Sequence, residues 1–90
     1  MAGKISFSKT FLKHFKKRIT PSKKISNQFN NRILLFSQNP QHPLLKDHML
    51  IGSKEGLRAF SVSGDIRVVY RIEIIGEYTL LDIGTHSQVY

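Results

Sequence analysis

The stretch IRVVYRIEII, residues 66–75, decides the fold, because apolar and mixed positions alternate along its ten residues. Successive side chains of a β-strand point to opposite faces of the sheet, so this alternation predicts a central strand. Its even-numbered positions are aliphatic or aromatic and predict a face buried in the core. Its odd-numbered positions include Arg67 and Arg71 and predict a face that something else contacts.

The strand before this stretch, within residues 57–62, can be placed by asking which hairpin loop keeps like faces together. A two-residue loop would set Val62 opposite Arg67, whereas a three-residue loop of residues 63–65 sets Val62 opposite Ile66. A register slip of one residue moves an apolar row into water, so we expect the longer loop. It places Ser61 opposite Arg67.

The strand after this stretch is expected to follow a two-residue turn at Gly76-Glu77. That turn pairs Ile74 with Thr79 and Tyr70 with Ile83 on the core face. On the other face the register predicts a constellation of Ser61, Arg67, Arg71, Asp82 and His86, with Arg71 opposite Asp82 and His86 across from Arg67.

Length and composition predict one small domain over residues 1–90. The chain has no cysteine, so it can form neither a disulfide nor a thiolate metal site. It contains neither an apolar run of the roughly 20 residues that a membrane span needs nor a secretory signal. We therefore expect a soluble cytoplasmic protein that does not bind membranes.

The formal net charge of +8 is unevenly distributed. Residues 1–46 carry ten Lys or Arg and no acidic residue, and all six acidic residues lie from Asp47 onward. A basic surface of this kind gains strongly from phosphate contacts, which favours a nucleic-acid partner. An acidic protein using the same surface, or a basic surface that only keeps the protein soluble, is an alternative.

The N-terminal half predicts a short strand at residues 4–7 and two helices. Ser8 is placed to cap the first helix, and Thr20-Pro21 is placed to open the second, which Asn39-Pro40 ends. Residues 41–56 predict a loop with a short extended piece at 49–51. The expected apolar stripes of the two helices are Phe11, Leu12, Phe15 and Ile19, then Ile25, Phe29, Ile33 and Phe36.

The element order β-α-α-β-β-β predicts an α+β fold, in which two N-terminal helices pack on one face of an antiparallel-rich four-stranded sheet. No glycine-rich phosphate loop, zinc-protease box or nucleophile elbow occurs, so we expect no metal and no cofactor. Arginine, histidine and aromatic residues together suit phosphate chemistry on single-stranded RNA.

Three motifs carry a resemblance to a known family: GLRA at residues 56–59, GDIRVVY at 64–70 and IGTHSQVY at 83–90. In this order and spacing they resemble the bacterial RelE/ParE toxin superfamily. The run KDH at residues 46–48, followed by Leu50 and Gly52, is similar to its YafQ-like branch, as is the GTH at 84–86.

This resemblance implies a RelE-like fold and a ribosome-dependent endoribonuclease that cuts messenger RNA in the decoding site and is neutralised by a cognate antitoxin. The 2′-hydroxyl of the RNA attacks the adjacent phosphate, and no metal or small-molecule cofactor is required. The residues that match functional positions of the family are His48, Asp65, His86 and Tyr90, with Arg67 as the phosphate-stabilising arginine. Ser61 departs from the pattern, because YafQ-like toxins carry another histidine there, which leaves the general base open.

The remaining charged residues are expected to form an electrostatic footprint for RNA. Its members are Lys13, Lys16, Lys17, Lys46, Lys54 and Arg58. Arg58 is expected on the sheet face that points to the core, so its aliphatic stem should be partly buried and its guanidinium should lie at the sheet edge. His14 and His42 are expected to be ordinary surface residues.

Two alternatives remain within the same superfamily. One is a ParE-like toxin that acts on DNA gyrase and does not cut RNA. The other is an inactive relative that only binds RNA or an antitoxin. His48 and the GTH motif favour the nuclease.

Overall fold

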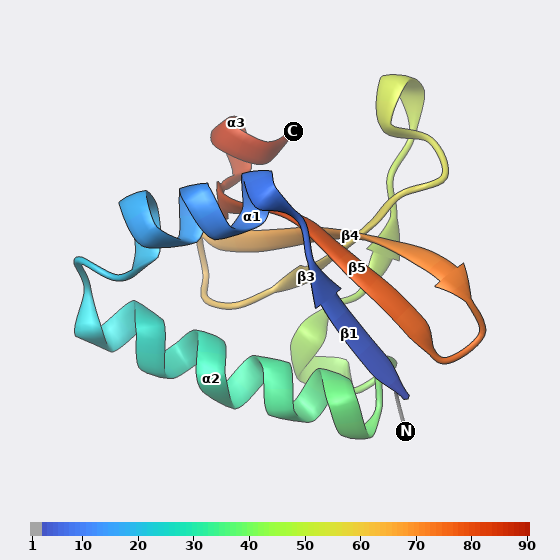
Figure 1. Ribbon diagram of the computed structural model, residues 1–90, viewed down its shortest axis with the longest axis horizontal. Coiled ribbons are helices and arrows are strands. Elements are labelled where there is room, and N and C mark those ends of the chain that lie inside the picture. The colour runs from blue at the N-terminus through green and yellow to red at the C-terminus, as the bar shows by residue number, and fades with distance from the viewer. Residues whose placement is uncertain (1–2) are drawn as a thin grey trace.

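The computed structural model describes residues 3–90, which form a mixed five-stranded sheet with helices (Figure 1). The strand order is β1-β5-β4-β3-β2, in which β1 runs parallel to β5 and the other neighbours are antiparallel. The predicted count of four strands missed β2, a two-residue strand inside the long loop. The strands are β1 (Lys4–Phe7), β2 (His48–Met49), β3 (Arg58–Ser61), β4 (Ile66–Ile74) and β5 (Glu77–Thr85).

The helices differ from the prediction mainly between residues 15 and 22. As predicted, Ser8 caps the first helix, since its hydroxyl accepts from the Phe11 N–H at 3.0 Å. The second helix is capped by Ser22, so the predicted Thr20-Pro21 start is wrong; Thr20 closes the first helix by bonding to Lys16. The elements are α1 (Lys9–His14), the π-helical η1 (Phe15–Ile19), α2 (Lys23–Gln38), the 3₁₀ turns η2 (Pro43–Leu45) and η3 (Gly52–Lys54), and α3 (His86–Val89). Within residues 3–90 no helix is long and apolar enough to cross a membrane.

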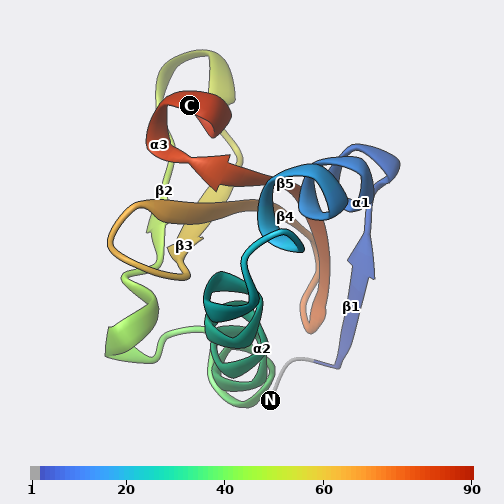
Figure 2. The ribbon, with the colours of Figure 1, turned by 90° about the vertical axis from the view of Figure 1, so that its left-hand side faces the viewer.

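The main core lies between the first two helices and one face of the sheet, as predicted (Figure 2). The even-numbered positions of β4 from Ile66 to Tyr70 are buried against helix residues such as Phe36, whose ring stacks on Phe60 at 4.8 Å. Leu12 is 54% exposed, so its predicted place in the core is wrong. The opposite sheet face has a smaller apolar cluster of Leu50, Ala59, Val69 and Val89, with Leu57 packed against it.

The register between β3 and β4 is the predicted one. Ser61 lies opposite Arg67, and the Val62 N–H donates to the Ile66 carbonyl at 2.8 Å, which closes a loop of residues 63–65. Burial explains this agreement, because any slip would expose the apolar row of β3.

The predicted register between β4 and β5 is wrong. The turn lies one residue earlier, at Ile75-Gly76, because Gly76 takes a φ of 85° that suits glycine at the second turn position. Two bulges, at residues 73 and 81, shift the pairing in opposite directions and cancel, so the earlier turn alone sets the net shift of two residues near the end of β5. Gly84, and not His86, therefore lies opposite Arg67.

The predicted Arg71–Asp82 pair does not form as a result. Arg71 lies opposite Thr79 and donates to Glu73 on its own strand, at 3.0 and 2.9 Å. Asp82 lies opposite Val69 and contacts His14, which is therefore not the ordinary surface residue that we expected.

A buried carboxylate joins the long loop to the sheet. Asp47, whose side chain is 2% exposed, accepts from Arg58 Nε at 3.0 Å and Nη2 at 2.6 Å, and it also accepts from the Tyr70 hydroxyl. Burial and then the bond to Asp47 raise the pKa of Tyr70, and the same carboxylate raises the pKa of Arg58. Asp47, Arg58 and Tyr70 thus form a triad that fixes the chain immediately before His48.

Replacing Asp47 by alanine should lower the free energy of unfolding by about 3–5 kcal/mol, because it leaves a largely buried guanidinium without its partner. Urea unfolding followed by circular dichroism measures this change. The matched control is Glu73→Ala, which breaks the exposed pair with Arg71 and should lower the stability far less, because solvent screens that pair. Equal losses in both variants would contradict the structural role of the triad.

Stability should also fall at high pH because of Tyr70. Its pKa is higher in the folded protein than in the unfolded chain, so ionisation favours unfolding. Its stabilising contribution is complete below about pH 10, the ordinary tyrosine value, and decreases as the pH rises further. Tyr70→Phe has no group to ionise and should lose stability less steeply above that pH, as measured by urea unfolding at a series of pH values. Parallel curves would refute the assignment.

Candidate active site

The candidate site lies where β4 begins and β5 ends. β5 passes at Thr85 into α3, whose start is stabilised by a capping box in which Gln88 Oε1 accepts from the Thr85 N–H at 2.8 Å. Val89 is buried in the smaller apolar cluster, which holds α3 against the sheet. His86 and Tyr90 are four residues apart, and their rings meet edge to face at 4.4 Å.

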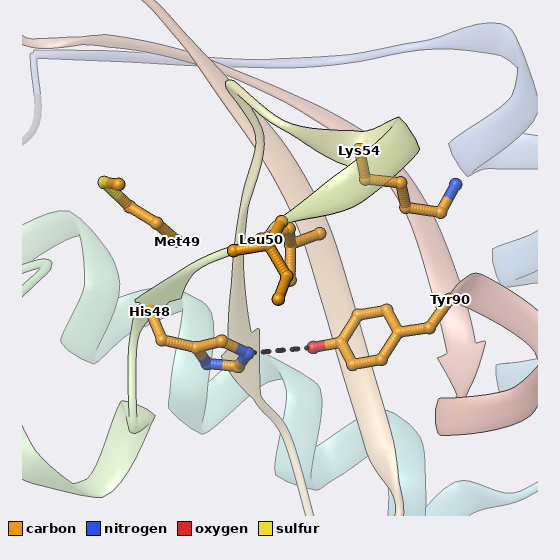
Figure 3. Close-up of a pocket in the computed structure, with 6 residues that line it drawn as sticks. His48, Met49, Leu50, Lys54 and Tyr90 are labelled. Carbon is orange, nitrogen blue, oxygen red and sulfur yellow. Dashed lines mark hydrogen bonds between the residues drawn. The ribbon is translucent and has the colours of Figure 1, made fainter.

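His48 comes to the same place from β2. Its Nδ1 lies 3.0 Å from the carbonyl oxygen of Lys46, a residue in the left-handed conformation with φ 50°. A carbonyl oxygen only accepts, so Nδ1 carries a proton and Nε2 of the neutral ring is an acceptor. The Tyr90 hydroxyl lies 3.4 Å from that Nε2 (Figure 3). The His48 imidazole is therefore oriented with its basic nitrogen toward Tyr90.

Tyr90 links the two histidines. Burial raises its pKa, and the positive charge of Arg67 opposes that rise. With a raised pKa the hydroxyl stays protonated at neutral pH and is a hydrogen-bond donor.

Arg67 is anchored through one nitrogen. Its Nη1 lies 2.9 Å from the Ser63 carbonyl and 3.2 Å from both the Gly64 carbonyl and the Ser61 hydroxyl oxygen. Ser61 is buried and donates its own hydroxyl to the Ser63 carbonyl at 2.8 Å. Within residues 3–90 the Nε and Nη2 groups of Arg67 make no hydrogen bond, so they remain available to an anion.

A cavity of about 560 Å³ opens beside the His48–Tyr90 pair. Its volume falls in the range of small-molecule pockets, about 300–1,000 Å³. Lys54 lies on the Tyr90 side of this cavity, whereas Met49 points away from the tyrosine (Figure 3). The lining residues are His48, Met49, Leu50, Ile51, Lys54 and Tyr90. The pocket thus combines aliphatic walls with an imidazole, a phenol and one ammonium group.

The structure brings together some of the predicted site residues and separates others. His48, His86 and Tyr90 form one group, with Arg67 close enough for its charge to act on Tyr90. Asp65 is exposed in the loop that anchors Arg67. His86 begins α3, so its predicted strand position is wrong.

The residues of the predicted basic footprint lie on different elements and have different surroundings. Arg58 has its guanidinium bound to Asp47, in keeping with the partly buried stem that its parity predicted. Lys54 lines the pocket beside Tyr90. Lys13 lies on α1, Lys16 and Lys17 lie on η1, and all three are exposed, as is Lys46.

Two residues near the site were missed by the sequence analysis. Asp47 could have been identified from the sequence, because it precedes His48 and an ion pair with Arg58 across the expected loop could have been predicted. No sequence pattern indicated the position of Arg18, because that position depends on the π-helical turn. Within residues 3–90 no three His, Asp or Glu side chains lie close enough together to hold a metal ion.

Known proteins resemble this chain over nearly its whole length. A family model described as "Bacterial toxin of type II toxin-antitoxin system, YafQ" matches residues 3–90. A copper-bound point mutant of a toxin from Helicobacter pylori is 30% identical, with a TM-score of 0.78, over 97% of this chain and 98% of that one. YafQ from E. coli is 25% identical, with a TM-score of 0.80, over 96% of both chains.

A third similar structure is the E. coli DinJ-YafQ complex, which is 25% identical to this chain with a TM-score of 0.77 and covers 96% of both chains. No curated protein sequence matches the chain significantly. The family match covers nearly the whole chain and includes every residue of the site described above. The chain therefore belongs to the YafQ family of bacterial toxins of type II toxin–antitoxin systems.

Proposed function

We propose that this toxin is an endoribonuclease that cuts messenger RNA on the ribosome without a metal ion. The observation that carries the proposal is the oriented His48 imidazole, with Nε2 facing Tyr90, a residue whose pKa burial raises and the charge of Arg67 lowers. A base, a proton donor and a guanidinium are the parts that cleavage by the RNA's own 2′-hydroxyl requires.

His48 is the proposed general base. Its Nε2 takes the proton of the 2′-hydroxyl as the 2′-oxygen forms a bond to the adjacent phosphorus. The hydrogen bond that Nδ1–H donates to the Lys46 carbonyl stabilises the imidazolium that results, because that nitrogen keeps its proton throughout. The 3.4 Å contact with Tyr90 is long, as catalytic hydrogen bonds often are before substrate binds. Ser61 is a poor substitute for the family histidine, since its hydroxyl is committed to Ser63.

Arg67 is the proposed electrostatic stabiliser. Negative charge grows on the phosphate oxygens as the 2′-oxygen attacks, and the free Nε and Nη2 groups can donate to two of them. Anchoring by Nη1 fixes the guanidinium before the substrate arrives, so little reorganisation is needed. Asp65, in the anchoring loop, is proposed to help orient this site.

The leaving 5′-oxygen must gain a proton as its bond to phosphorus breaks. Tyr90 and His86 are the proposed donors, because they lie in contact and the Tyr90 hydroxyl stays protonated at neutral pH. The products are a 2′,3′-cyclic phosphate and a 5′-hydroxyl. DNA cannot react in this way because it lacks the 2′-hydroxyl.

The partners follow from charge and from the family. Exposed lysines of α1 and η1, together with Lys46 and Lys54, provide a basic surface for ribosomal and messenger RNA in the cytoplasm. The E. coli relative is found in a complex with DinJ. We propose that a cognate antitoxin likewise binds and neutralises this toxin.

Primer extension on a translated message after brief induction tests the reaction. The wild-type protein should produce new cleavage sites, and Arg67→Gln should cut about 10²–10³-fold more slowly, the usual cost of one lost oxyanion donor. Arg71→Gln is the matched control, because it removes the same group from an arginine that is paired with Glu73, and it should cut at the wild-type rate.

The same assay separates the alternatives. Equal cleavage by the wild type and Arg67→Gln would remove the arginine from the mechanism. Growth arrest with intact messages and with gyrase-dependent DNA damage would replace the nuclease by a ParE-like activity. A lack of both effects would leave an inactive relative.

A further inference from the structure

The edge of β5 is open beyond the end of β1. β1 pairs only with residues 77–80 of β5, so the carbonyl groups that follow need other partners. Ser8 donates its hydroxyl to the Leu81 carbonyl at 3.0 Å, and Arg18 Nη1 donates to the Ile83 carbonyl at 3.0 Å. Arg18 therefore crosses the sheet edge from the helix side.

The guanidinium of Arg18 reaches the face that carries Arg67. A Cβ atom added to Gly84 would lie 2.7 Å from Arg18 Nη1 and 2.6 Å from Gln88 Oε1. Gly84 lies opposite Arg67, and directly opposed residues of an antiparallel pair direct their side chains to the same face. Only glycine leaves room there for the Arg18 guanidinium.

The π-helical turn places Arg18 at this edge. The Thr20 N–H bonds to the Phe15 carbonyl at 3.1 Å, five residues back, which defines the wide turn. Ile19 is fully buried in the core, and the preceding Arg18 is turned toward β5. The wider turn thus lets Ile19 pack in the core while the adjacent Arg18 contacts the edge of β5.

Arg18 retains free hydrogen-bond donors. Within residues 3–90 its hydrogen bonds use Nη1 alone, and its side chain is 21% exposed. Asp82 Oδ1 lies 3.5 Å from Arg18 Nη1. The closer partners of Asp82 Oδ1 are His14 Nδ1 at 2.6 Å and the Ile83 N–H at 2.8 Å. The Nε and Nη2 groups can therefore form the planar fork that suits a phosphate.

We propose that Arg18 is a second phosphate-binding residue, which holds a phosphate of single-stranded RNA next to the one that faces Arg67. The Arg18 guanidinium lies at Gly84, and Arg67, opposite Gly84 on β4, extends its guanidinium to the loop of residues 63–65. The proposed RNA backbone therefore runs across the ends of β5 and β4, from Arg18 toward Arg67. This inference rests on the proposed function and extends it, because it assigns a path for the substrate.

The test is binding of a short fluorescent single-stranded RNA whose riboses are 2′-O-methylated, so that it cannot be cut. Fluorescence anisotropy gives the Kd at a series of salt concentrations. Arg18→Gln should weaken binding several-fold and lower the slope of log K against log salt by about 0.7, the value for one phosphate contact on a single strand. Arg71→Gln, an equal loss of charge at a paired arginine, should leave the slope unchanged.

Arg18→Lys distinguishes charge from folding. It keeps the positive charge and should retain the wild-type slope, with weaker binding because an ammonium group cannot form the fork. An unchanged slope in Arg18→Gln would overturn the inference. An equal loss of binding in Arg18→Gln and Arg18→Lys that follows their melting temperatures would also overturn it, because that pattern means that Arg18 only stabilises the fold.

The outcome is separable from that of the proposed reaction. Message cleavage by the wild type together with an Arg18-independent salt slope would remove only this inference. An Arg18-dependent slope without cleavage would remove only the nuclease. If the wild type does not bind the RNA probe, the phosphate role of Arg18 is wrong.

Discussion

The carboxylate of Asp47 is the constraint on which the rest of the site depends. It is buried, and it accepts from an arginine of β3 and a tyrosine of β4. A buried charge is tolerated only when its partners are in place, so the long loop has one position relative to the sheet. His48 is the next residue, and the fixed loop therefore determines where its imidazole lies. The hydrogen bonds that stabilise the loop therefore also position the candidate base.

Much of the fold could be predicted because burial restricts it. The alternation in residues 66–75 identified the central strand, and its apolar row fixed the register with β3. The register with β5 could not be read in the same way. It depends on the position of the turn, which the positive φ of Gly76 sets and the apolar pattern does not show. Parity alone cannot detect a shift of two residues.

The site was predicted by residue type better than by position. His48, His86 and Tyr90 meet because Lys46 takes a left-handed conformation and because Val89 of α3 is buried in the smaller apolar cluster. Both causes are properties of the folded chain. Arg18 shows the same limit more clearly, since its approach to Gly84 requires a π-helical turn and an open sheet edge. Sequence patterns report which face a residue occupies, but they do not report how far a long side chain reaches around an edge.

The most direct test of this account is a crystal structure of the toxin with a short RNA that carries a 2′-O-methyl group at the reacting ribose. We expect a phosphate oxygen within about 2.7–3.2 Å of Arg67 Nε or Nη2, with the modified 2′-oxygen beside His48 Nε2. RNA bound instead over the outer surface of α1 and α2, with its phosphates remote from Arg67, would contradict it.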